Sequence, residues 1–407
     1  MGDADFRFGQ YVLDVDRRRL DHGGHRVDIE PQALELLCHL VEHRGRVVTE
    51  EELRDRIGHE HAVTETALAT WMSMARIAIG DSEVRQQLIR SVPPHGYRFV
   101  GHTTPAATRP TDRTGGPTLP AVTAEMGADH EVIRFCRSAD GTRIAYALAG
   151  QGPPLVKTAN WLTHLHLDRT NPMWAHWFEG LTHGRQLVRY DERGCGLSSW
   201  EMGRFTIDDL VADLHAVVEA AGLDRFPLLG VSQGGAVAVA YAARHPERVS
   251  HLILTSAYAR GQQIRAGSDD ERDAAEVDLN IARAGWRSQD SSFLRYFASQ
   301  FLADATPAQW DAFAAYQRET TSAANGLRFI EEFSRIDVSG IADQVSCPTL
   351  IVHSRDDARV PVAQALELAT LIPDSRLILL EGRNHLLTAD DAAWPAFLTH
   401  LRTFLSE

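Results

Sequence analysis

Gly230-Val231-Ser232-Gln233-Gly234 decides the fold of the longer part of this chain. The stretch follows an apolar run, Phe226-Pro227-Leu228-Leu229, and precedes a run of small residues at 235–243. This order predicts a strand, a tight turn and a helix. Glycines on both sides of the serine suit a turn that has no room for a Cβ atom. Such a turn would hold the Ser232 hydroxyl at the carboxyl end of the strand, beside a helix N-terminus that favours developing negative charge.

From Val132 onward, strand-like and helical segments alternate, which predicts a mostly parallel sheet. The candidate buried strands are Leu187-Val188-Arg189-Tyr190-Asp191, Pro227-Leu228-Leu229-Gly230, Leu252-Ile253-Leu254 and Thr349-Leu350-Ile351-Val352. Residues of about 260–338 interrupt this alternation with helical sequence that is rich in aromatic residues. An insertion at that place predicts a helical cap over a site at the carboxyl ends of the strands.

Residues 131–407 resemble the α/β-hydrolase family. Besides the Ser232 turn, Asp191-Glu192-Arg193-Gly194-Cys195-Gly196-Leu197-Ser198 matches the D-x-R-G-x-G-x-S turn of that family. Asp357 lies four residues before Pro361, as the acid of the family does, and His385 closes a Gly-x-Asn-His turn. The resemblance implies an α/β-hydrolase fold in which His385 takes the proton of Ser232 and Asp357 holds the imidazole tautomer. The alternative acid is Asp356, which the spacing to Pro361 disfavours.

The segment that would stabilise an oxyanion departs from the family pattern. Many members carry His-Gly after an early strand, where this chain has Ala159-Asn160. The resemblance assigns the two oxyanion donors to the backbone N–H groups of Trp161 and Gln233. A backbone donor survives a change of side chain, so we expect a serine ester or lactone hydrolase site.

Neither a metal nor a cofactor is expected. His164-Leu165-His166-Leu167-Asp168 looks like the H-x-H-x-D of metal-dependent lactonases, but Arg169 stands where that motif needs a histidine. The four cysteines are scattered without C-x-x-C spacing, which is typical of reduced thiols. Cys195 sits in a glycine-rich turn without an obvious base, so we interpret it as a packing residue.

The first hundred residues have a different pattern: short strands, three helices and a hairpin. They resemble the winged helix-turn-helix output domain of two-component response regulators. Three signatures carry the resemblance: Ala33-Leu34-Glu35-Leu36-Leu37, Arg46-Val47-Val48-Thr49-Glu50-Glu51-Glu52-Leu53 and Gly96-Tyr97-Arg98-Phe99. It implies a DNA-binding domain over residues 1–103. Residues 104–130, rich in Thr, Pro, Ala and Gly, predict a flexible linker.

In that family the third helix enters the major groove and the hairpin tracks the phosphate backbone. The positions expected to face DNA are Thr66, Thr70, Ser73 and Arg76 on the helix and Arg90 and Arg98 on the hairpin. The net charge is −14, and residues 1–101 carry 13 basic against 17 acidic side chains, or −4. This balance disfavours tight non-specific DNA binding. A homodimer on repeated half-sites would supply the missing affinity, and the alternative is a winged helix used only for protein contact.

Together the two parts predict a one-component transcriptional regulator with an α/β-hydrolase-fold sensor. The sensor would bind, and slowly hydrolyse, a small apolar ester or lactone. The alternative is a serine hydrolase whose winged helix is vestigial or a docking module. No apolar run is long enough for a membrane span and no signal peptide is recognisable, so the expected location is the cytoplasm.

Overall fold

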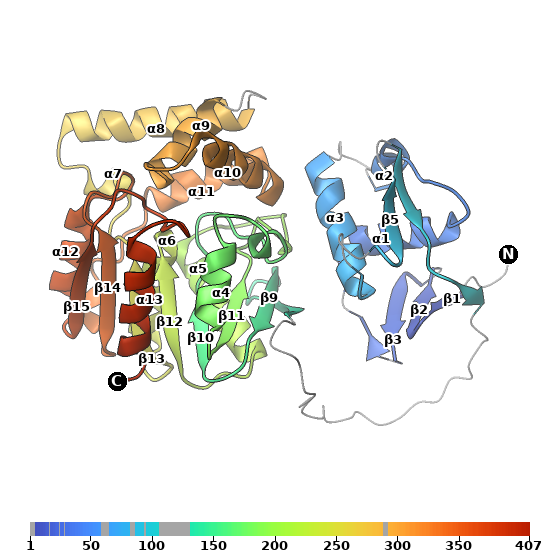
Figure 1. The fold of residues 1–407 in the computed structure, drawn as a ribbon, viewed down its shortest axis with the longest axis horizontal. Coiled ribbons are helices and arrows are strands. Elements are labelled where there is room, and N and C mark those ends of the chain that lie inside the picture. The colour runs from blue at the N-terminus through green and yellow to red at the C-terminus, as the bar shows by residue number, and fades with distance from the viewer. Residues whose placement is uncertain are drawn as a thin grey trace. The chain divides into compact units, whose positions relative to one another are not determined.

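The computed structural model describes residues 5–15, 17–23, 25–27, 29–57, 65–81, 86–92, 95–105, 131–287 and 292–407. The chain divides into two compact units, Met1–Glu125 and Met126–Glu407. Figure 1 shows both units, and each is described by itself below.

The first unit opens with a small antiparallel sheet in the order β4-β3-β2-β1-β7. Its strands are β1 (Asp5–Phe8), β2 (Tyr11–Asp14), β3 (Arg19–His22), β4 (His25–Arg26) and β7 (Thr104–Pro105). β7 pairs with β1 through the contacts Phe6↔Pro105 and Arg7↔Thr104. Residues 104–105, which were expected to begin the linker, therefore belong to this sheet, and residues 106–130 lie outside the described residues.

Three helices and a hairpin follow: α1 (Pro31–Glu42), α2 (Glu50–Ile57), α3 (Glu65–Ala78), β5 (Ile89–Val92) and β6 (Gly96–Phe99). The core of this unit includes the buried apolar residues Leu37 and Val41 of α1 and Leu68 and Met72 of α3. Gly96 has a φ of +120°, and a Cβ there would lie 2.1 Å from the Val48 carbonyl oxygen. Only glycine allows that approach, which lets Tyr97 and Val48 exchange backbone hydrogen bonds of 2.8 and 2.9 Å.

The second unit is built on an eight-stranded sheet in the order β15-β14-β13-β12-β10-β11-β9-β8 among the described residues. β8 and β9 are antiparallel to their neighbours, and β10 to β15 are parallel to one another. The strands are β8 (Val132–Arg137), β9 (Arg143–Ala149), β10 (Pro154–Lys157), β11 (Gln186–Tyr190), β12 (Phe226–Val231), β13 (Val249–Thr255), β14 (Thr349–Ser354) and β15 (Ser375–Leu380).

Helices connect these strands and pack on the sheet (Figure 1). They are α4 (Ala175–Thr182), α5 (Ile207–Ala220), α6 (Gln233–Arg244), α12 (Val362–Leu371) and α13 (Ala393–Phe404), with short turns at η1 (Leu167–Arg169) and η2 (Ala342–Gln344). β14 is buried over its whole length and β12 at every position except the half-buried Pro227, as expected of parallel strands covered on both faces.

Between β13 and β14 the chain leaves the sheet and forms α7 (Gln262–Arg265), α8 (Asp269–Arg287), α9 (Ser292–Phe301), α10 (Pro307–Thr320) and α11 (Ala323–Phe333). These helices gather at one end of the sheet (Figure 1) and lie within the range in which a cap was expected. No helix in the described part of the chain is long and apolar enough to cross a membrane.

Candidate active site

Ser232 stands between β12 and α6 in a conformation that few residues other than glycine adopt, with φ 55° and ψ −127°. The chain can turn this sharply because its neighbours are glycines. A Cβ at Gly230 would lie 2.6 Å from the Gly235 Cα, and one at Gly234 would lie 2.3 Å from the Ala159 carbonyl oxygen. The strained turn presents the Ser232 hydroxyl at the carboxyl end of β12.

Three side chains from three different loops form one hydrogen-bonded chain. Ser232 Oγ lies 2.8 Å from Nε2 of His385, and Nδ1 of His385 lies 2.8 Å from Oδ2 of Asp357. Because a carboxylate can only accept, Nδ1 carries the proton and Nε2 is left to accept from the serine. The structure thus brings together all three residues of the expected triad, whereas Asp356 is exposed.

Asp357 is held in the ionised form. Its other oxygen accepts hydrogen bonds of 2.8 Å from the backbone N–H groups of Arg359 and Val360. Burial alone would raise the pKa of Asp357, but the neighbouring His385, with its hydrogen bond, brings the pKa below the ordinary value. An ionised Asp357 is what a histidine needs if it is to accept a proton from serine.

The expected oxyanion donor at Trp161 is already occupied. The Trp161 backbone N–H donates to Oε1 of the Gln233 side chain at 2.7 Å. Gln233 Nε2 donates in turn to Oε1 of Glu192 at 3.3 Å. The other expected donor, the Gln233 backbone N–H, belongs to the first residue of α6, where helical N–H groups have no partner within their own helix. Nothing in the residue pattern predicts this hydrogen bond from Trp161 to the glutamine side chain.

Burial makes Glu192 a carboxylic acid rather than a carboxylate. Its pKa rises to about 8, chiefly because burial disfavours the charged form and also because Asp213 is nearby. Its second oxygen has no hydrogen-bond partner in the described part of the chain. Glu192, from the D-x-R-G turn identified in the sequence, is thus a neutral residue that accepts a hydrogen bond from the Gln233 side chain.

The loop that carries Trp161 is anchored by Lys157. Nζ of Lys157 donates to the Asn160 side-chain oxygen and, at 3.2 Å, to the Thr158 carbonyl. Burial of the ammonium lowers its pKa to about 8. Asn160, which departs from the His-Gly of the family, is therefore tied to the end of β10, and this contact fixes the path of the loop without a glycine.

An apolar pocket opens on Ser232. Its free volume is about 60 Å³, room for a few water molecules or a small acyl group. The walls come from Trp161, Tyr258, Leu279, Phe297, Phe301, Ile330 and Phe333, and three charged side chains, Arg265, Asp278 and Arg359, also line it. Most of these residues belong to the helices between β13 and β14, and sequence reasoning did not single out the charged ones.

The end of α9 is bonded directly to the histidine loop. The carbonyl oxygen of Phe301 accepts hydrogen bonds from the backbone N–H groups of His385, at 2.9 Å, and of Leu386, at 3.1 Å. The Phe301 ring also lies edge-on to the His385 imidazole, with 5.4 Å between ring centres. The position of His385 therefore depends on the helices above the sheet as well as on the sheet itself.

The H-x-H-x-D segment has a packing role in the structure. His164 is buried, and burial lowers its pKa to about 3. Asp168 accepts from Arg189 at 3.0 Å and from the Tyr316 hydroxyl at 2.6 Å. Through these contacts Asp168 joins α10 to the interior strand β11.

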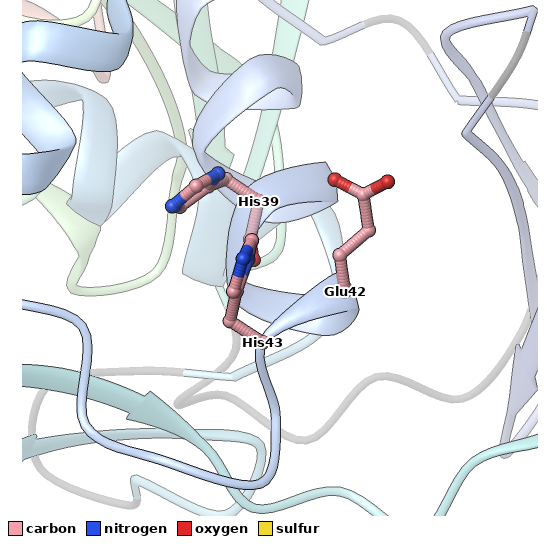
Figure 2. Close-up of side chains that lie close together, drawn as sticks. All are labelled: His39, Glu42 and His43. Carbon is pink, nitrogen blue, oxygen red and sulfur yellow. The ribbon is translucent and has the colours of Figure 1, made fainter.

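In the first unit, His39, Glu42 and His43 each have a possible ligand atom within 4.8 Å of the others. Figure 2 shows the two imidazoles close together at the C-terminal end of α1 with Glu42 beside them. One nitrogen of each histidine is already engaged. His39 Nε2 lies 2.9 Å from Glu52 Oε1, and His43 Nδ1 lies 2.9 Å from the His39 carbonyl. This cluster is where a metal ion would find ligands in the described part of the chain.

The outward orientation expected for three residues of α3 is wrong. Thr70, Ser73 and Arg76 are buried. Arg76 donates to Ser91 Oγ at 2.9 Å and lies over the Tyr97 ring, so it joins α3 to the hairpin instead of pointing outward. The side chain of Thr66 lies outside the described residues.

Arg90 and Arg98 are exposed, as expected, and pair directly across β5 and β6. Two like charges opposite each other repel, so the pair costs stability unless an anion lies between or beside them. This is the arrangement that a phosphate backbone would favour.

Comparison with known proteins identifies both units. The family described as alpha/beta hydrolase fold matches residues 169–392. The chain belongs to this family. Residues 24–99 match the family described as transcriptional regulatory protein, C terminal, so the first unit is a winged helix-turn-helix domain of the response-regulator output type. The fold class and the fusion that the sequence predicted are confirmed.

Individual relatives match the hydrolase-fold unit. The chain is 26% identical over 275 residues to the pyrrolizixenacetamide deacetylase of Xenorhabdus hominickii, covering 65% of this chain and 94% of that protein. It is 28% identical over 226 residues to the putative carbamate hydrolase RutD of Klebsiella pneumoniae, covering 54% and 81%.

Solved structures agree on the fold. An esterase from Exiguobacterium antarcticum superposes with a TM-score of 0.58 at 22% identity, covering 67% of this chain and 99% of that one. A bromoperoxidase from Bacillus anthracis superposes with a TM-score of 0.57 at 24% identity, covering 68% and 100%.

Proposed function

We propose that this chain is a one-component transcriptional regulator whose hydrolase-fold unit binds a small acyl compound and hydrolyses it with Ser232, His385 and Asp357. The ligand would be an ester, a lactone or, by analogy with the deacetylase and carbamate hydrolase relatives, an amide. The observation that carries the proposal is the unbroken hydrogen-bond chain from Asp357 to Ser232 beneath an apolar pocket.

The chemistry follows from the arrangement. Ser232 Oγ would attack the acyl carbon while His385 accepts its proton, and His385 would then donate that proton to the leaving group. Water would repeat the sequence to release the acid. Because the Trp161 N–H is held by Gln233, the first step would start with only the Gln233 backbone donor free, and slow turnover is expected. Slow turnover suits a sensor, since the bound state persists before the signal is removed.

A regulatory role needs the ligand to bind two states of the protein unequally. The Phe301–His385 contact would couple ligand binding to the position of the histidine loop, because a ligand that moves the helices above the pocket also moves that loop. For DNA contact the exposed pair Arg90 and Arg98 remains from the expected set. With so few basic groups, a homodimer on repeated half-sites would supply the affinity.

The test uses the full chain and a fluorophosphonate probe, which acylates reactive serines. We expect the wild type to be labelled and Ser232→Ala to remain unlabelled while folding normally. A second assay measures whether 4-nitrophenyl acetate or a lactone changes binding to DNA duplexes selected from a random pool. A folded wild type that resists the probe would refute the catalytic part, and unchanged DNA binding at saturating ligand would refute the regulatory part.

One observation favours a second function, a serine hydrolase whose winged helix only docks to protein. Three of the four helix positions expected to meet DNA are buried. In that case the probe would label Ser232, but no selected duplex would bind the full chain at low salt.

A further inference from the structure

We propose that the acyl compound bound beside Ser232 also carries a carboxylate, and that Arg265 binds it. This inference rests on the proposed function of the pocket and names its substrate class: half-esters, half-amides or carboxylated lactones instead of purely apolar acyl compounds.

Arg265 is a cation without a matching anion. It is the last residue of α7 and lines the same pocket as Ser232 and Gln233. Among the described residues its guanidinium makes one hydrogen bond, a long one of 3.5 Å, from Nη1 to the Arg260 carbonyl. Its guanidinium also lies 6.0 Å from the centre of the Tyr258 ring. In the parts of the chain that the structure describes, no carboxylate lies within ion-pair distance of it.

The neighbouring arginines differ in this respect. Arg359, on the same pocket wall, donates to Asp278 at 3.0 Å and to Gln300 at 2.5 Å. Arg260 pairs with Glu367 at 2.7 Å. The charged lining of the pocket is therefore Arg265, Arg359 and Asp278, which sums to one positive charge, and that charge belongs to Arg265.

An arginine in this position stays charged, because its pKa is far above neutral pH even though burial lowers it. Asp357 and Asp278 act on this charge from a distance, but no carboxylate of the described residues lies close enough to replace the lost hydration with an ion pair. A ligand carboxylate would compensate it through two parallel hydrogen bonds, the geometry in which guanidinium and carboxylate match best. The apolar side chains of Leu279, Phe297 and Ile330, which line the same pocket, would contact the methylene groups between the carboxylate and the acyl carbon.

The test compares two substrates of equal length that differ in one charge: 4-nitrophenyl hydrogen adipate and 4-nitrophenyl methyl adipate. For the full-length wild type we expect kcat/KM to be about tenfold to a hundredfold higher for the acid than for the methyl ester. Arg265→Gln should reduce that ratio to about one, chiefly by lowering kcat/KM for the acid. Arg260→Gln is the matched control, since Arg260 has its own carboxylate partner and does not line the Ser232 pocket; it should keep the wild-type ratio.

A binding measurement separates this inference from catalysis. In the Ser232→Ala background, monomethyl adipate should raise the melting temperature and dimethyl adipate should not, and Arg265→Gln should abolish the difference. Equal rates and equal stabilisation by the two compounds would overturn the role of Arg265 while leaving the hydrolase standing. Failure of the wild type to react with the fluorophosphonate probe or with either ester would instead refute the proposed function.

Discussion

The backbone N–H of Trp161 donates a hydrogen bond of 2.7 Å to the side-chain oxygen of Gln233, the residue that follows the candidate nucleophile. The glutamine oxygen thereby accepts the hydrogen bond that the proposed mechanism assigns to the negatively charged oxygen of a tetrahedral intermediate. If Trp161 is one of the two oxyanion donors, as proposed, an incoming acyl group would have to displace the Gln233 side chain before it gains both.

Replacing Gln233 by leucine should therefore accelerate acylation of Ser232. The leucine cannot accept a hydrogen bond, so the Trp161 N–H becomes available to the substrate. A single oxyanion donor contributes about 3 kcal/mol in other serine hydrolases. Because the loop also loses a support, we expect a smaller gain, about tenfold in the rate of fluorophosphonate labelling.

Gln317→Leu is the control for this variant, because Gln317 accepts from the indole nitrogen of Trp161 and not from its backbone. It should leave the labelling rate near the wild-type value. A Gln233→Leu protein that folds normally but labels more slowly would show that the side chain supports catalysis instead of obstructing it.

Asp357→Asn should lower esterase kcat by about 10³ to 10⁴, because an amide favours the wrong tautomer of His385. The neighbouring Asp356→Asn should change kcat by less than twofold, since Asp356 is exposed. Single-turnover kinetics on both variants check this. A large loss in Asp356→Asn with a small one in Asp357→Asn would reverse the assignment of the acid.

Gly234→Ala should destabilise the hydrolase-fold unit by about 2 kcal/mol or more and reduce labelling of Ser232. The new methyl group would lie 2.3 Å from the Ala159 carbonyl oxygen and 2.5 Å from Thr158 Oγ1, and neither backbone nor buried hydroxyl can move away easily. Gly340→Ala is the matched substitution, because a Cβ there meets nothing within 4 Å. Urea unfolding curves measure the difference, and equal midpoints for the two variants would contradict the close packing of the turn.

Glu192 should make stability fall as the pH rises. Its pKa is raised from 4.5 to about 8 in the folded protein, so between these values the folded state keeps a proton that the unfolded state has released. The contribution of Glu192 is therefore complete below about pH 4.5 and is lost as the pH passes 8. Each pKa unit corresponds to about 1.4 kcal/mol, so the wild type should lose a few kcal/mol relative to Glu192→Gln.

Urea midpoints at pH 5, 6, 7 and 8 test this expectation. Glu201→Gln, a substitution at an exposed glutamate in the segment after the D-x-R-G turn, should run parallel to the wild type. Parallel curves for Glu192→Gln as well would mean that Glu192 is ionised in the folded protein.

Arg90→Gln and Arg98→Gln should each weaken DNA binding and reduce the slope of log K against log salt by about one. Arg76→Gln should behave differently. Because Arg76 is buried against the hairpin, its loss should mainly lower the melting temperature and not the salt slope of DNA binding. Arg17, exposed elsewhere in the same unit and paired with Asp14, provides the control. Unchanged salt slopes in both hairpin variants would remove the DNA contact from the proposal.

The sequence predicted the parts of this molecule that depend on local pattern. The alternation of strand-like and helical segments predicted the sheet, and the glycines around Ser232 predicted the turn. The family spacing selected Asp357 and His385, and in the structure His385 lies within hydrogen-bond range of both Ser232 and Asp357. These features follow from backbone geometry, which determines the spacing of apolar and turn residues along the sequence.

Features that depend on side-chain direction were not predictable in this way. Arg76 carries a charge and sits on a helix expected to face DNA, yet its guanidinium found hydrogen-bond partners on the hairpin. Gln233 was named for its backbone, and its side chain proved to be the group that accepts the hydrogen bond of the Trp161 backbone N–H. Arg265 is one of 41 basic residues, and what distinguishes it is that it lines the Ser232 pocket without a carboxylate partner among the described residues.

Lys157 has one more consequence. It is the only lysine in the sequence, and its amine is buried at the end of β10, beneath the loop that carries Trp161. Reagents that acylate lysine side chains can reach it only when that part of the sheet opens. The Lys157 amine is thus a natural chemical probe of local opening near the candidate nucleophile. The rate at which this one amine is modified, followed by mass spectrometry with and without ligand, would measure how firmly the site is closed.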